Sequence, residues 1–184
     1  MLTRILIAVA AIGAMSLTAF AQTRENGTPE QNAVARKATA QRLIDGEKSC
    51  TGCDIFQVDL SYQELTGRDL SGARIRQADL SLSTFDHTKF AGADMSIVNA
   101  FGIKAEDADF SNVNFADAVL VGGWFGRSHF AGAKFDNANI SGSDFSSAIG
   151  LSQSQLNTAC GDSETKLPKG LTVVICKTDV ALAG

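Results

Sequence analysis

The chain has 184 residues, of which 45% are hydrophobic and 20% are charged, and its formal net charge at pH 7 is −4. This length suits one domain of moderate size, and the apolar content is sufficient to build a buried core. The acidic balance argues against nucleic-acid binding, because phosphate groups would be repelled.

The first 21 residues have the features of a secretory signal peptide. Arg4 supplies the charged region, an apolar stretch runs from Ile5 to about Leu17, and a small-x-small cleavage site precedes Gln22. The apolar run is too short to span a membrane comfortably. We therefore expect an exported protein, periplasmic or extracellular, without stable membrane insertion after cleavage. An uncleaved anchor is the alternative.

Residues 22–49 are expected to contain a linker followed by a helix. Thr28 is the predicted N-cap, Pro29 occupies the first helical position, and Gln31 stands where a capping-box partner belongs. A weak apolar stripe follows and ends before Gly46. The stripe consists of Val34, Ala38, Leu43 and Ile44.

From residue 55 to residue 145 every fifth residue is apolar, and 17 of these 19 residues are large. The residue two positions earlier is small in 16 of the 19 units, the exceptions being Gln63, Arg68 and Ile103. A period of five fits neither a helix nor a flat strand, so the chain must turn corners at the rate of the repeat. The pattern predicts a solenoid. Its large residues are Ile55, Leu60, Leu65, Leu70, Ile75, Leu80, Phe85, Phe90, Met95, Phe110, Phe115, Leu120, Phe125, Phe130, Phe135, Ile140 and Phe145, and Ala100 and Ala105 are the two small ones.

Four units of this block share a short motif: Ala-Asp-Leu at 78–80, Ala-Asp-Met at 93–95, Ala-Asp-Phe at 108–110 and Ala-Asn-Ile at 138–140. In these units the block resembles the pentapeptide-repeat proteins, whose consensus is A(D/N)LxX. The resemblance implies an all-β fold, a right-handed quadrilateral parallel β-helix with four units per coil. About five coils would then make a rod roughly 24 Å long at the usual strand spacing.

The ends of such a rod need caps, because uncovered coils expose apolar rungs and unpaired strand edges. The predicted N-terminal helix suits one end. Beyond residue 150 a short helical segment is expected from Ser152 to Cys160, followed by a loop and a strand-like stretch from Leu171 to Cys176. The predicted organisation is a signal peptide (1–21), a linker with the capping helix (22–49), the β-helix (50–149) and a C-terminal cap (150–184).

The four cysteines allow three pairings, and export would permit disulfides. On the rod that the resemblance implies, Cys50 and Cys53 precede the first coil, whereas Cys160 and Cys176 follow the last. That separation excludes a four-cysteine zinc site. We expect a Cys160–Cys176 disulfide that staples the C-terminal cap. For Cys50 and Cys53 a structural bond is the favoured interpretation, and a redox pair is the alternative.

The side of the rod that carries the units centred on 60, 80, 100, 120 and 140 differs from the others, because its outward positions include several large apolar residues. Contiguous exposed apolar surface on a soluble protein usually marks a contact site. The alternative is that Phe101 folds inward to fill the space beside Ala100 and Ala105 and that a terminal segment covers the rest. In either case we expect Phe101 or Ile103 to compensate locally for the two small residues. The predicted interaction surface consists of Tyr62, Leu82, Phe101, Val119, Val121 and Trp124.

Polar residues elsewhere on the rod favour no enzyme. His129 could meet Asp109 one coil away, but no nucleophile or oxyanion-stabilising group accompanies the pair. A second polar cluster is better explained as surface charge than as a weak cation site. Its members are Asp86, His87, Glu106, Asp107 and Arg127. We expect no catalytic residue, no cofactor and no metal.

Two functions remain after these exclusions. The favoured one is a non-enzymatic exported scaffold that binds a protein partner, or a second copy of itself, through the apolar face. The alternative follows from the resemblance: residues 53–149 carry 13 acidic and 7 basic residues, and an acidic rod of this family could imitate DNA and bind DNA gyrase. Export and the interspersed Arg74, Lys89 and Lys134 count against the alternative.

Overall fold

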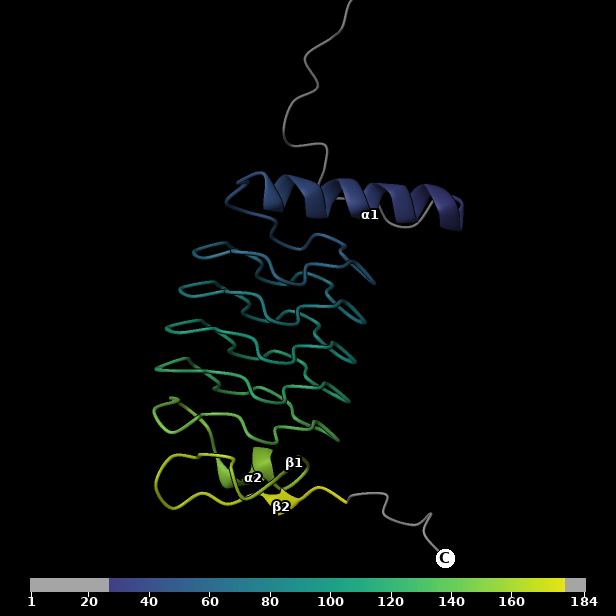
Figure 1. Ribbon diagram of the computed structural model, residues 1–184. Coiled ribbons are helices and arrows are strands. Elements are labelled where there is room, and N and C mark those ends of the chain that lie inside the picture. The colour runs from purple at the N-terminus through teal and green to yellow at the C-terminus, as the bar shows by residue number, and fades with distance from the viewer. Residues whose placement is uncertain (1–26, 178–184) are drawn as a thin grey trace, which may run out of the picture.

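Residues 27–177 are described by the computed structural model, in which they form a column of stacked coils (Figure 1). Helix α1 (Pro29–Ile44) lies across one end of the column. The other end carries helix α2 (Gln153–Leu156) and the short strands β1 (Cys160–Gly161) and β2 (Val174–Ile175). The predicted signal peptide, residues 1–21, lies outside the described residues.

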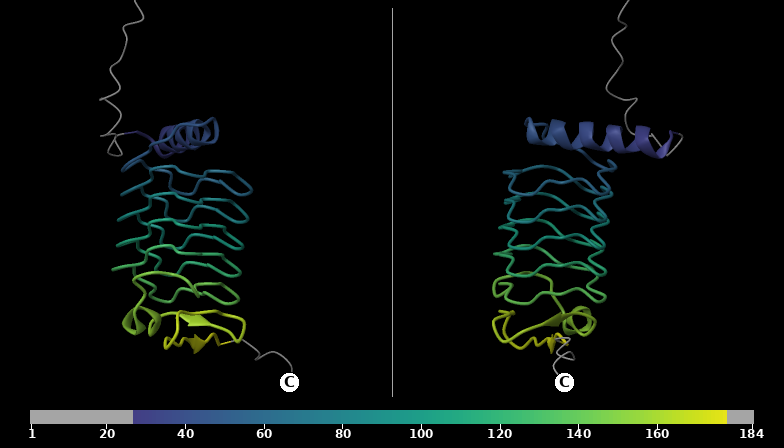
Figure 2. Two further views of the ribbon diagram at one scale, coloured as in Figure 1. Left: turned by 90° about the vertical axis from the view of Figure 1, so that its left-hand side faces the viewer. Right: turned by 45° about the vertical axis from the view of Figure 1, so that its right-hand side comes forward.

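The coils are joined by parallel backbone bridges between residues that are 20 apart. One series links Asp54, Arg74 and Asp94, and an equivalent bridge occurs at every fifth residue. A 20-residue coil made of five-residue units has four sides, and the side views show these coils superimposed in register (Figure 2). Each coil therefore forms its hydrogen bonds with the coils above and below it.

Two-residue turns connect the sides, and from residue 52 to residue 142 the second residue of each turn adopts a left-handed conformation. Glycine fills many of these positions, as at Gly102 (φ 62°), but Tyr62 (φ 60°) and Leu82 (φ 56°) also adopt it. This region is uncommon for residues with a bulky side chain. The turns point these side chains away from the core.

The large residue of every unit points into the column and is essentially inaccessible to solvent. In the C-terminal half the rungs are mainly phenylalanines, whose rings stack from coil to coil: Phe90 on Phe110 at 5.0 Å, and Phe110 on Phe130 at 5.1 Å between centroids. Offset aromatic stacking adds to the energy of burial. The interior is filled with side chains, which leaves no room there for a substrate.

The small inward positions also carry hydroxyl groups that join adjacent coils. Ser83 Oγ donates to the carbonyl oxygen of Leu60 and accepts from the backbone N–H of Gln63. Ser128 makes the same pair of contacts with Ala105 and Ala108. Because buried hydroxyl groups need partners, these bonds fix the stacking register of the coils.

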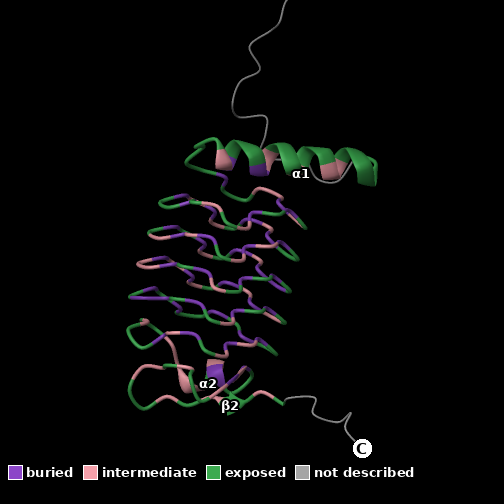
Figure 3. Cartoon of the chain, in the orientation of Figure 1, coloured by how far each residue is buried: buried purple, intermediate pink, exposed green. Residues whose placement is uncertain are grey.

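Helix α1 begins as the sequence predicts. Thr28 Oγ1 accepts from the N–H of Gln31, whose side chain in turn accepts from the N–H of Thr28. Most of the helix surface is exposed (Figure 3), and the buried residues are Ala40 and Leu43 in its C-terminal half. The N-terminal half extends beyond the edge of the coils (Figure 1).

At the opposite end the stack continues past residue 150 with altered spacing. Asn139 bridges to Cys160, and Asp144 bridges to Lys166. The helical segment predicted from Ser152 to Cys160 is shorter in the structure, because α2 ends at Leu156. Gln155 attaches this helix to the rod, because its amide nitrogen donates to two carbonyl oxygens of the preceding coil.

Candidate functional site

The predicted interaction surface is an exposed feature of the rod. We call its residues the apolar patch; they are Tyr62, Leu82, Phe101, Val119, Val121 and Trp124. Tyr62 is 73% exposed, Phe101 is 49% exposed and Leu82 is 46% exposed, whereas Val121 is half-buried. Asn99, two residues before Phe101, bridges to Val119, so Phe101 and Val119 belong to neighbouring coils. The patch therefore extends along the rod axis.

Phe101 does not turn inward, so that part of the alternative interpretation is wrong. Ile103 fills the space instead: it is buried between the two small rungs Ala100 and Ala105. The coil below makes room for it, since a Cβ at Gly123 would come within 3.2 Å of Ile103 and 2.5 Å of the Phe125 ring. Large and small inward positions are thus exchanged in this coil, which leaves Phe101 on the surface.

Trp124 lies on the side of the rod that follows the corner at Tyr62, Leu82 and Gly102, where it bridges to Lys104 and Asp144. Its indole is folded against the backbone of Gly126, where a Cβ would meet the ring at 2.9 Å. Gly126 is buried beneath the ring, while Trp124 itself remains 42% exposed. The indole therefore offers one flat face to solvent, and tryptophan is among the residues that contribute most to binding at interfaces.

The structure also exposes large apolar residues that the sequence interpretation did not single out: Ile97, Ile149, Val174 and Ile175. Ile149 lies two sides away from Val119, which in a four-sided coil is the opposite side of the rod. Ile97 and Ile149 stand apart from one another. Single exposed apolar residues of this kind are normal on a protein surface.

The polar cluster predicted as surface charge forms an ion-pair network. Arg127 donates from Nε to Asp107 Oδ1 at 2.8 Å, and its Nη2 lies 3.1 Å from Glu106 Oε1 in an ion pair. His87 Nδ1 lies 3.7 Å from Asp107 Oδ2, and Lys104 pairs with Asp86. The hydrogen bond from Arg127 lowers the pKa of Asp107. The network lies at the surface and pairs three carboxylates with Arg127, Lys104 and the His87 ring, which suits a solvated surface.

Within residues 27–177, His87 rather than His129 is the histidine that comes within 4 Å of a carboxylate. No group of three or more histidine, cysteine or acidic side chains in this part of the chain could hold a metal ion. Over the same range, no helix combines the length and hydropathy needed to cross a membrane.

Both predicted disulfides are present. Cys160 is bonded to Cys176 and Cys50 to Cys53. The first bond joins β1 to the end of the segment that carries β2, and the second lies in the turn where the chain enters the first coil. The four cysteines are all bonded and lie at the two ends of the rod.

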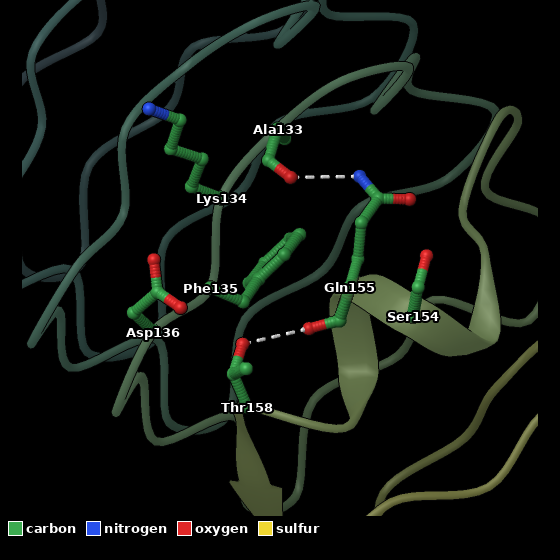
Figure 4. A pocket seen from close by; sticks show the side chains of 7 residues that line it. All are labelled: Ala133, Lys134, Phe135, Asp136, Ser154, Gln155 and Thr158. Atoms are coloured by element: carbon green, nitrogen blue, oxygen red, sulfur yellow. Dashed lines mark hydrogen bonds between the residues drawn. The ribbon is translucent and has the colours of Figure 1, made fainter.

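One hollow lies where α2 replaces a regular side of the coil (Figure 4). Its volume is about 190 Å³, and it is lined by Lys134, Phe135 and Asp136 on one side and by Ser154, Gln155 and Thr158 on the other. Gln155 uses its amide nitrogen on Phe130 and Ala133 and its oxygen on Ser152. The polar group that reaches into the hollow is therefore already satisfied by the protein.

The repeat block of this chain matches a known family of sequences. Eight copies of the family model "Pentapeptide repeats" match residues 64–99 and 108–149. The gap between the two matched ranges contains Ala100, Ile103 and Ala105, where the inward sizes are exchanged. No curated protein matches the chain.

Among solved structures, a pentapeptide repeat protein from the Arabidopsis thaliana thylakoid lumen is 26% identical, with a TM-score of 0.55, over 57% of this chain and 72% of that one. HetL, involved in heterocyst differentiation regulation in the cyanobacterium Nostoc, is 18% identical with a TM-score of 0.34, over 71% of this chain and 89% of that one. QnrB1, a plasmid-mediated fluoroquinolone resistance protein, is 22% identical with a TM-score of 0.42, over 72% and 82% of the two chains.

Proposed function

Because the repeat block of this chain belongs to the pentapeptide-repeat family, whose members fold as right-handed quadrilateral β-helices, we propose that the protein is an exported, non-enzymatic scaffold that binds another protein. The partner is a different protein or a second copy of this chain. The observation that carries the proposal is the apolar patch, which stands on a rod whose other outward positions are mainly polar.

The corner residues of the patch adopt the left-handed conformation that the turns of this rod require. At the corner position of successive coils the chain has Tyr62 and Leu82 and then glycine at 102, 122 and 142, and all five adopt positive φ. A large side chain in this conformation costs on the order of 1 kcal/mol relative to glycine. The same conformation occurs at Gln57, Gln77 and Ile97 in other turns of the rod, so it is a property of the fold and does not by itself mark the patch.

Export is part of the proposal. The signal-like residues 1–21 support it, and so do the two disulfides, which persist mainly in oxidising compartments. The 26% identical protein from the thylakoid lumen is a pentapeptide repeat protein in a membrane-enclosed compartment, which is consistent with the same proposal. Helix α1 and the stapled segment 150–177 then act as caps that protect the rod ends.

The alternative of an acidic rod that imitates DNA has less support. Along one side the outward residues are Asp54, Arg74, Asp94, Asn114 and Lys134, and Arg74 pairs with Asp54 at 3.3 Å. This ladder alternates in sign, whereas duplex DNA presents a continuous row of negative charge. Inhibition of gyrase supercoiling by micromolar amounts of residues 22–184 would revive the alternative.

The test of the proposal is site-specific cross-linking in the compartment where the protein resides. A photo-crosslinking amino acid replaces Leu82 in one variant and Ile149 in the matched control, since both side chains are 46% exposed but lie on different sides of the rod. We expect a protein adduct from position 82 and none from position 149. Absence of an adduct at 82, or the same adduct from both positions, would refute the proposal.

A further inference from the structure

The corner that carries the apolar patch changes shape along the rod. Leu82 lies over the next coil, where a Cβ at Gly102 would come within 2.6 Å of Leu82 Cδ2. Below it, a Cβ at Gly122 would meet no heavy atom within 4 Å, and a Cβ at Gly142 would meet only backbone, at 3.9 Å. The N–H of Gly142 donates to Asp162 Oδ1 at 2.8 Å, so the C-terminal segment borders the strip at that end. Phe101 immediately precedes Gly102, and Val121 immediately precedes Gly122. The corner therefore offers a side-chain-free strip bordered by apolar residues.

The spacing of the coils selects the kind of segment that can lie along this strip. Adjacent coils are about 4.8 Å apart, and the α-helix rises 5.4 Å per turn, so one helical turn nearly matches one coil. Alternate residues of an extended strand are separated by about 6.6 Å, and such a strand loses register after one coil. The absence of side chains at Gly122 and Gly142 allows a helix to approach the backbone closely.

Addition of a β-strand to the side of the rod is excluded by the hydrogen bonding at the patch. Asn99, Val119 and Asn139 form successive bridges, so the backbone at each of these coils is already paired with the coils above and below. An incoming strand would need a free edge. A segment bound here must rely on its side chains, which again favours a helix.

Three carboxylates border the N-terminal end of the patch without ion-pair partners in the described part of the chain: Asp59, Glu64 and Asp79. Their contacts are with neutral groups. Asp59 accepts from Ser61 N and Oγ, Glu64 accepts from Thr84 Oγ1, and Asp79 accepts from Ser81 N and Asn99 Nδ2. The Ser61 hydroxyl lowers the pKa of Asp59. This end of the patch thus carries uncompensated negative charge beside Tyr62 and Leu82.

We propose that the apolar patch binds one cationic amphipathic α-helix of a different protein, aligned with the rod axis. The apolar side chains of the helix contact Leu82, Phe101 and Val121, and its lysine or arginine residues lie against Asp59, Glu64 and Asp79. The inference rests on the proposed function, because it names the chemistry of the segment that the proposed interaction surface receives.

The direct test measures binding of labelled synthetic peptides to the disulfide-bonded protein, residues 22–184, by fluorescence anisotropy. The cationic peptide has 14 residues, with leucine at i, i+3, i+4 and i+7 and lysine elsewhere. The first comparison peptide has glutamate in place of lysine. The second keeps the cationic composition but scatters leucine around the helix. We expect saturable binding of the amphipathic cationic peptide, with both comparison peptides at least tenfold weaker. Equal binding of either comparison peptide would overturn the inference.

Matched variants separate the patch from general attraction to an acidic protein. Leu82→Ser should weaken binding about tenfold through lost apolar contact, whereas Ile149→Ser should leave it unchanged. The pair Glu64→Gln with Asp79→Asn should weaken binding about two- to tenfold and reduce its salt dependence, because exposed ion pairs are modest and screened. The control pair Asp94→Asn with Asp109→Asn removes the same net charge from the two sides of the rod that do not carry the patch. Equal losses in the two pairs would overturn the role of the acidic border.

A second copy of this chain is an outcome that the same assay detects. A peptide of residues 27–44 contains Arg36, Lys37 and Arg42 against Glu30, so it is also cationic. If it binds at the patch and the intact protein sediments as an oligomer, the partner is another copy and the inference about a separate partner fails. Adducts at position 82 that map to a non-helical or acidic segment would also refute the inference and leave the proposed function standing. No adduct would refute both.

Discussion

Arg68 donates a hydrogen bond from Nη2 to the carbonyl oxygen of Leu43, at 3.3 Å, where helix α1 ends on the first coil. Arg68 is 7% exposed and occupies an inward position that is small in most other units. A cation at a helix C-terminus is favourable. Its Nε, however, has no partner, and burial of a charge is costly. The contact therefore holds α1 in place at a cost to the stability of the rod.

The variant Arg68→Met tests this balance. Loss of a hydrogen bond to a charged group removes about 1.5–3 kcal/mol of local stabilisation, so amide exchange at Arg42, Leu43 and Ile44 should rise by about tenfold or more. The global free energy of unfolding should change by less than about 1 kcal/mol, because the buried charge disappears as well. Hydrogen exchange with mass spectrometry measures the first quantity and denaturant unfolding the second. Arg76→Met, on an exposed turn, is the control. Unchanged protection of α1 would contradict the assigned contact.

The exchanged sizes around Ile103 give a second prediction. Ala100→Leu should destabilise the protein by about 1–3 kcal/mol, because the space beside Ala100 is already filled. Ile103→Ala should cost about 2–4 kcal/mol through the cavity that it leaves. Urea unfolding of both variants measures the costs, with Ile75→Leu as a volume-conserving control at a regular rung. A stabilising Ala100→Leu would show that a void remains there.

The sequence predicts the repeat well because one physical rule, an apolar side chain at every fifth position, acts independently in each coil. The capping box at Thr28 was also predictable, since its hydrogen bonds involve residues three apart. Local patterns did not determine the exposure of Phe101 or the early end of α2. The exposure of Phe101 depends on a neighbour one coil away, because Gly123 makes room for Ile103. The attachment of α2 likewise depends on the preceding coil, whose carbonyl oxygens at Phe130 and Ala133 accept from Gln155.

The candidate site was predictable to a similar extent. Stacking residues at intervals of 20 identified the exposed members of the apolar patch, because the side of the rod follows directly from the register. The fold of Trp124 onto Gly126 was not predictable, since it depends on side-chain rotation over a surface that the register does not describe. Within residues 27–177, Asp59, Glu64 and Asp79 have no ion-pair partner, and this could not be predicted without the positions of the nearby cations.

The two disulfides should contribute unequally to stability. In the chain-entropy model, replacement of Cys160 and Cys176 by serine costs about 3 kcal/mol, whereas the shorter loop of Cys50 and Cys53 gives about 2 kcal/mol when opened. The first replacement should also release β2, because Cys176 lies next to its end. Thermal unfolding and exchange at Val174 and Ile175 measure both effects. Equal loss of stability from the two double variants, with β2 still protected, would contradict this assignment.

Acid sensitivity should follow from two serine–aspartate contacts. The hydroxyl groups of Ser61 and Ser71 donate to Asp59 and Asp69 and lower the pKa of each carboxyl below its ordinary value of 3.8. A carboxyl whose pKa is lower in the folded state stabilises the protein above the unfolded pKa, and this contribution is lost as the pH falls through the folded pKa. The stability of the protein should therefore decline below about pH 4.

In Ser61→Ala/Ser71→Ala the free energy of unfolding should fall by a few tenths of a kcal/mol at pH 7, after allowance for solvent screening. The difference from the unmodified protein should vanish near pH 2. Ser111→Ala is the control, since Ser111 donates to Asp109 from its backbone N–H. A difference that persists at pH 2 would show that the hydroxyl groups act through packing and not through the carboxylates.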